Sequence, residues 1–79
     1  MNKVHWVKTK KYGDTMVTNN SKEQKIYDDT GHIRHTYPVG MVVRWIDDNK
    51  GPQIDWIEGP FTTNFKSDKE LANYIDSNI

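Results

Sequence analysis

Residues that favour turns recur along this chain at intervals of about eight to twelve, and this spacing most constrains its fold. The turn-forming segments are Gly13-Asp14, residues 19–22, residues 28–31, Pro38, residues 47–53 and Gly59-Pro60. Between them lie short runs of β-branched and aromatic residues, which fit the pleated surface of a sheet. We therefore predict antiparallel strands over residues 3–8, 15–18, 24–27, 33–37, 41–46 and 54–58.

Three of these strands carry further signals. Apart from Arg44, residues 41–46 are apolar on both faces of the strand, which places this strand at the centre of the sheet. Residues 24–27 and 33–37 flank Gly31, which is expected to take the positive φ of a bulged hairpin turn. Pro38 should end the second strand of that hairpin because it has no amide hydrogen for a ladder.

One helix is predicted near the end of the chain. Ser67-Asp68-Lys69-Glu70 has the S-x-x-E pattern of a capping box, in which Ser67 and Glu70 each accept the other's amide hydrogen. Beyond it, an apolar stripe that needs a sheet to cover consists of Leu71, Tyr74, Ile75 and Ile79. The predicted class is α+β: a small antiparallel sheet of about four to six short strands with one C-terminal α-helix packed on a face.

The length predicts a single domain over residues 1–79, close to the lower limit for a self-supporting core. Only 34% of the residues are hydrophobic, and the chain has no cysteine for disulfides. Most aromatic side chains are therefore expected to serve the core first. Homo-oligomerisation would relieve the shortage of apolar surface, so a homodimer stays open.

The segment from Arg44 to Glu58 reads RWIDDNKGPQIDWIE and predicts a hairpin with two tryptophans. In one register, Trp45 faces Trp56 and their rings form a cross-strand pair. In a register shifted by one residue, Arg44 faces Trp56 through a cation–π contact and Trp45 faces Asp55. We expect at least one tryptophan in the core; one on an uncovered face would anchor a partner. The predicted partner-binding residues are Trp45, Trp56, Arg44 and Asp55.

The N-terminal strand interleaves cations with aromatic rings, which suggests an alternative nucleic-acid surface. Its members are Lys3, His5, Trp6, Lys8, Lys10, Lys11 and Tyr12. On a strand, Lys8 and Lys10 would share a face that could follow phosphates while rings stack on bases. The competing interpretation is an edge strand whose lysines prevent aggregation. It is favoured because the whole chain has a formal net charge of zero.

No pattern in the sequence predicts catalysis, a metal or a cofactor. His32 and His35 are three residues apart, so on a strand they point to opposite faces and chelate poorly. The carboxylates of the hairpin, among them Asp47 and Asp48, do not follow the spacing of a calcium loop and suit ordinary turns. The chain also lacks a nucleophile elbow and a glycine-rich phosphate loop. We therefore predict that it is not an enzyme.

These observations predict a small non-enzymatic protein that binds another protein, with nucleic acid as the alternative partner and no membrane partner. Nine lysines against two arginines indicate an AT-rich genome, which suits a regulator or inhibitor of phage or mobile-element type. No apolar run approaches the roughly 20 residues of a membrane span. The first residues lack the apolar region of a signal peptide, so a cytoplasmic location is expected.

Overall fold

The computed structural model describes residues 4–79, and within them the chain forms six strands, a short 3-10 helix and one α-helix. The elements are β1 (His5–Thr9), β2 (Gly13–Asn20), β3 (Gln24–Tyr27), β4 (Ile33–Tyr37), β5 (Gly40–Asp47), β6 (Gly51–Glu58), η1 (Thr62–Asn64) and α1 (Asp68–Asn78). All strand pairs are antiparallel, which confirms the predicted α+β class.

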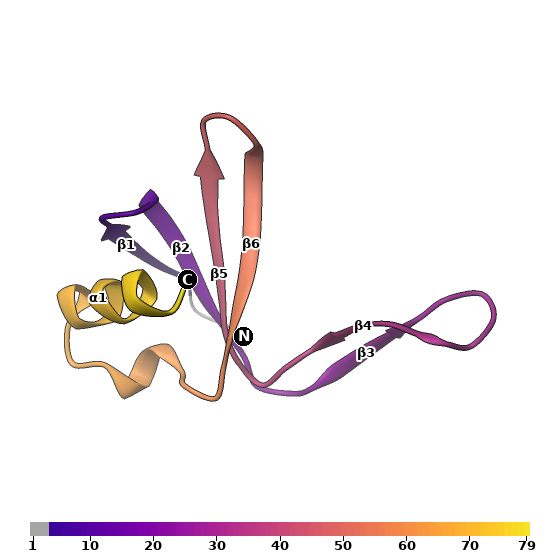
Figure 1. The fold of residues 1–79 in the computed structure, drawn as a ribbon. Helices are drawn as coiled ribbons and strands as arrows, with labels where there is room; N and C mark the ends of the chain where they lie inside the picture. The colour runs from indigo at the N-terminus through magenta and orange to yellow at the C-terminus, as the bar shows by residue number, and fades with distance from the viewer. Residues whose placement is uncertain (1–3) are drawn as a thin grey trace.

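The strands build two separate sheets. The larger has the order β1-β2-β5-β6, and the smaller is the hairpin β3–β4, inserted between β2 and β5. Figure 1 shows α1 lying beside β1 and β2, whereas the hairpin projects from the other side of the sheet, away from the helix. We call residues 21–37, which include this hairpin, the arm. As predicted, β5 has neighbours on both sides, and its residues 40–43 are buried.

The hairpin of β5 and β6 has a register that differs from both predicted ones. Trp45 pairs with Gln53, and Trp56 pairs with Val42. The two tryptophans therefore sit at positions of opposite parity, and their side chains lie on opposite faces of the sheet. Both predicted registers are wrong because they assumed a long loop after Ile46.

The connection between β5 and β6 is shorter because local chemistry closes it early. The Asp47 carboxylate accepts hydrogen bonds from the amides of Asn49 and Lys50, at 2.8 and 3.1 Å. Gly51 has φ +82°, the left-handed conformation that glycine adopts without strain. Pairing consequently continues to Asp47 and Gly51, and only three residues remain in the loop.

Strand β2 is longer at both ends than the predicted strand. Gly13 has φ +68° and begins the strand, so the turn from β1 precedes it. At the other end, Asn19 was expected in a turn, but its side chain donates to Thr62 Oγ1 at 3.1 Å. The Thr62 amide donates back to Asn19 Oδ1 at 2.9 Å, so this pair fastens η1 to the sheet.

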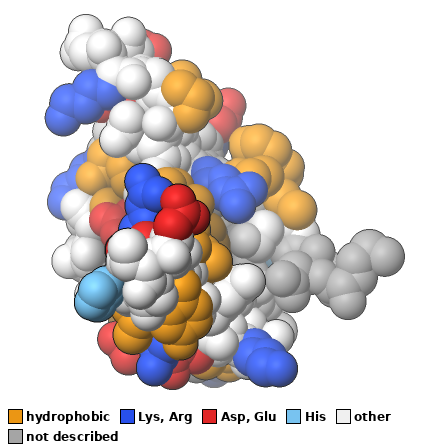
Figure 2. Space-filling view, turned by 90° about the vertical axis from the view of Figure 1, so that its right-hand side faces the viewer, with side chains coloured by type: hydrophobic (Ala, Val, Ile, Leu, Met, Phe, Trp, Pro, Cys, Tyr) orange, Lys and Arg blue, Asp and Glu red, His pale blue; other side chains and the backbone are white. Residues whose placement is uncertain are grey.

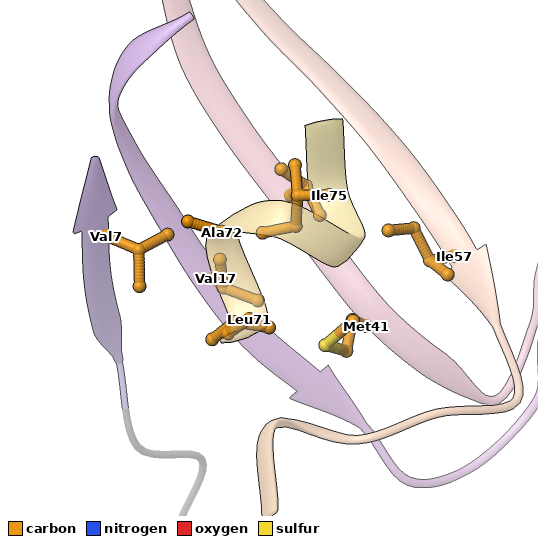
Figure 3. Close-up of a cluster of buried hydrophobic side chains, with 8 residues drawn as sticks. Val7, Val17, Met41, Ile57, Leu71, Ala72 and Ile75 are labelled. Atoms are coloured by element: carbon orange, nitrogen blue, oxygen red, sulfur yellow. The ribbon is translucent and has the colours of Figure 1, made fainter. Parts of the chain in front are cut away.

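The core lies between α1 and one face of the larger sheet (Figure 3). Its buried members are Val7, Val17, Met41, Val43, Ile57, Leu71, Ala72 and Ile75. The predicted helical stripe is confirmed at Leu71 and Ile75, with Tyr74 and Ile79 packed at its margin. Ala72 belongs to the core too, because a small side chain lets the helix approach the sheet.

Polar contacts fix both ends of α1. Ser67 Oγ accepts the Glu70 amide hydrogen at 3.2 Å, as expected for the cap. The return bond from the Glu70 side chain is not among the hydrogen bonds of residues 4–79, so half of the predicted box forms. Near the other end, the Asp76 carboxylate accepts the amides of Lys10 and Lys11, at 2.9 and 3.1 Å. These bonds hold the helix against the turn after β1.

The tip of the arm is organised by Asp28. Its carboxylate accepts hydrogen bonds from the Thr30 hydroxyl at 2.7 Å, the Thr30 amide at 2.9 Å and the His32 amide at 3.0 Å. Gly31 has φ +83°, and the pairing shifts register between Ile26 and Tyr27. The predicted bulged turn with a left-handed glycine is therefore confirmed.

We predict that Ile75→Ala lowers the free energy of unfolding by about 2–5 kcal/mol, because Ile75 is fully buried under the sheet. The matched control is Ile46→Ala, whose side chain is 65% exposed and should change stability by no more than about 0.5 kcal/mol. Urea denaturation of dilute protein measures both values. Equal losses for the two variants would contradict the assignment of the core to the helix side.

The arm turn should loosen in acid. The Thr30 hydroxyl, followed by the His32 amide, lowers the pKa of Asp28 below its ordinary value of 3.8. These bonds therefore stabilise the turn above pH 3.8 and are lost as the pH falls through the lower folded-state pKa. We expect NMR signals of the Thr30 and His32 amides to shift together with a midpoint below 3.8.

Asp28→Asn removes this titration, whereas Asp29→Asn leaves the bonded carboxylate in place and should keep it. A midpoint at or above 3.8 in the unmodified chain would contradict the bonding of the turn.

Candidate functional site: the open sheet face and the arm

The larger sheet has one face that α1 does not cover, and we call it the open face. Cross-strand pairing aligns Trp6 with Met16, Met16 with Arg44, and Arg44 with Ile54. These four side chains form one row across all four strands of the sheet, because paired residues point to the same face. Trp6 is 65% exposed and Ile54 is 50% exposed, so large apolar groups face solvent here.

A groove follows this row. It has a volume of about 430 Å³ and is lined by Trp6, Asp14, Met16, Arg44, Trp45, Ile46, Pro52, Gln53 and Ile54. Six of these nine side chains are apolar, and the guanidinium of Arg44 lies among them. Scattered apolar residues are normal on protein surfaces, whereas the apolar side chains of this groove are contiguous.

The arm adds a second groove next to the first. At its base, Tyr37 stacks on Trp56 with ring centroids 4.6 Å apart, and His35 meets Tyr37 edge-on at the same distance. Trp56 pairs with Val42, which is on the open face yet only 5% exposed. The aromatic stack therefore covers the lower end of the open face and anchors the arm to it.

This second groove has a volume of about 610 Å³ between the arm and β6. Its lining consists of Ile26, Arg34, His35, Tyr37, Ile54, Asp55 and Trp56. Ile54 belongs to both grooves, which makes the surface continuous from the arm to β1. Figure 2 views the molecule from the side on which the arm projects, and hydrophobic side chains lie there among both basic and acidic ones.

Arginine and aromatic side chains are concentrated on this surface. Both arginines of the chain, Arg34 and Arg44, line the two grooves, together with Trp6, Trp56 and Tyr37. Tryptophan, tyrosine and arginine are the residues most enriched at the energetic centres of interfaces. These residue types thus lie together on the open face and at the base of the arm.

The free edge of β6 is closed to a further strand. Pro52 has no amide hydrogen to offer at this edge. The Trp56 amide donates to the carboxylate of the preceding Asp55 at 2.8 Å, which also occupies it. Proline and charged side chains at a sheet edge discourage strand addition. A partner of this sheet would therefore meet its face and not the edge of β6.

The four residues predicted to bind a partner are divided between the faces. Arg44 and Trp56 lie on the open face, whereas Trp45 and Asp55 have the opposite parity. Trp45 packs at the margin of the core, with its ring 4.3 Å from that of Tyr12. The expectation that at least one tryptophan serves the core is thus confirmed for Trp45.

The predicted nucleic-acid cluster is divided as well, and Lys3 lies outside the described residues. Trp6 and Lys8 project from the open face, whereas His5 has the opposite parity. The prediction placed Lys8 and Lys10 on one strand face. Strand β1 ends at Thr9, so Lys10 lies outside the strand and this prediction is wrong. Lys10, Lys11 and Tyr12 instead connect to α1: two backbone amides reach Asp76, and the Tyr12 hydroxyl donates to the Ile79 carbonyl at 3.0 Å.

Sequence reasoning missed Met16, Ile54 and Tyr37 as members of the surface. A signal was available for Met16, because it lies between Thr15 and Val17, which are both fully buried. The stack of Tyr37 on Trp56 joins residues that are distant in sequence, and no local pattern contains it.

Within residues 4–79, no three His, Asp or Glu side chains come together as metal ligands, and no helix is long and apolar enough to cross a membrane. No family model matches the chain, and neither a curated protein nor a solved structure matches it.

Removing a tryptophan should lower the stability of the protein by different amounts on the two faces of the sheet. Trp45→Ala should lower the free energy of unfolding by about 3 kcal/mol, because the ring packs on the core and on Tyr12. Trp6→Ala should change it by no more than about 0.5 kcal/mol, since this ring is largely in solvent. Thermal and urea melts of dilute protein check both values, and a reversed order would refute this assignment of faces.

Proposed function

We propose that this chain is a small non-enzymatic binding protein, a regulator or inhibitor of phage or mobile-element type, that acts by contacting another protein through its open face. The observation that carries the proposal is the row of Trp6, Met16, Arg44 and Ile54 across the uncovered sheet. A chain with only 34% hydrophobic residues exposes large apolar side chains on one contiguous groove.

Burial of this groove would release a large free energy. Each square ångström of apolar surface removed from water contributes about 25 cal/mol, and one aromatic side chain can bury about 150–250 Å². Arg44 would add direction, because a guanidinium within an apolar surround selects a partner with a carboxylate or carbonyl opposite it.

Nucleic acid is the weaker candidate for this face. Trp6 and Lys8 do share it, which favours stacking and a phosphate contact. However, Asp14 is the cross-strand partner of Lys8, so the two charges offset each other. A binding surface for a polyanion usually has a clear cationic excess.

The proposal predicts that a protein partner is retained on the immobilised chain from lysate of the organism that encodes it, with or without nuclease. Ile54→Asp should weaken this retention at least about tenfold, because it places an unpaired carboxylate in the centre of the contact. Asn73→Asp adds the same charge on an exposed position of α1 and is the matched control.

Equal retention by wild type and Ile54→Asp would overturn the assignment of the open face. Material that disappears after nuclease treatment, with affinity that falls steeply with salt, would establish the nucleic-acid alternative instead.

A further inference from the structure

We propose that one partner of the open face is a second copy of this chain, and that the two copies exchange arms so that each arm lies on the open face of the other. This inference rests on the proposed function, because it names a partner for the same surface. It follows from two uncovered apolar surfaces in one small molecule, which a single symmetric contact would cover together.

The arm is the first of these surfaces. Every residue from 21 to 36 is exposed, and Tyr27 and Ile33 are 57% and 53% exposed. Tyr27 and Ile33 are also cross-strand partners, so their side chains form one apolar patch near the tip. A two-stranded hairpin is marginally stable in water without a surface to pack on. The arm contacts its own sheet at the base, through the stack of Tyr37 on Trp56.

The open face is the second surface, and the arm of the same chain leaves its upper part uncovered. Figure 1 shows the arm projecting away from the larger sheet, so its tip is far from β1 and from the turn between β5 and β6. A second copy related by a two-fold axis brings its own tip to this position and receives the first tip in return. Such an isologous contact is closed, and the same residues of both chains form it.

The charges of the two surfaces are complementary. The tip of the arm carries Asp28 and Asp29, and the open face carries Arg44 together with Lys8 and Asp14, whose charges offset each other. Exchange places an acidic tip over Arg44 twice in each dimer. The chain as a whole has a formal net charge of zero, so two copies do not repel each other at neutral pH.

A stable dimer must cover a substantial part of each chain. A stable interface removes about 800 Å² from each partner, which is about one seventh of the 5914 Å² of this chain. In the exchange each copy contributes both its arm and its open face, and apolar side chains that are about half exposed or more lie on both. These are Tyr27 and Ile33 on the arm, and Trp6, Ile46 and Ile54 on the face.

Analytical ultracentrifugation over a micromolar to millimolar series tests the inference with three proteins. Wild type should reach twice the 9.3 kDa mass of one chain. Ile33→Asp in the arm and Ile54→Asp in the face should each remain monomeric. An equimolar mixture of the two variants should dimerise again, because the arm of the face variant and the face of the arm variant form one intact contact.

The design separates this dimer from the others that the surfaces allow. An arm variant that still dimerises alone would indicate packing of face on face, and a face variant that dimerises alone would indicate pairing of arm with arm; either result overturns the exchange. Failure of the mixture to recover, with both variants folded by circular dichroism, also overturns it. A monomeric wild type that retains a host protein through Ile54 refutes the second copy alone and leaves the proposed function standing.

Discussion

The packing of α1 against one face of the larger sheet determines the rest of the structure. A single helix of eleven residues can cover only one face of four strands, and its buried residues are Leu71, Ala72 and Ile75. Side chains of one parity, such as Val17 and Val43, therefore become core. Those of the other parity remain in solvent unless something else covers them. The open face is thus a direct consequence of having one helix.

The same contact also explains why the turn after β1, which contains Lys10 and Lys11, lies against α1. Asp76 on α1 accepts two backbone amides of the turn after β1, and Tyr12 closes the margin of the core against Trp45. The N-terminal segment has the sequence of a cationic binding strand, but part of it holds α1 against the sheet. The arm is independent of this arrangement, since it meets the sheet through aromatic stacking on the other side.

The sequence predicted the strands, the helix and its cap because these depend on local chemistry: β-branched runs, Gly31 in a left-handed turn, and Ser67 before Glu70. It did not predict the register of β5 and β6, which depends on how early Asp47 and Gly51 close the loop. A shift of register exchanges the faces of every residue in a strand. The register in which Trp45 faces Trp56 placed both rings on one face, whereas the observed register places them on opposite faces.

The central claim is that Trp6 is open to solvent in the dilute chain while Trp45 is packed at the core. The most direct measurement is the relaxation of the three indole N–H signals in NMR by a soluble paramagnetic agent, at a concentration where the chain is monomeric. The account predicts strong broadening for Trp6 and weaker broadening for Trp45 and Trp56, which are both half-buried. Protection of Trp6 together with strong broadening of Trp45 would contradict it.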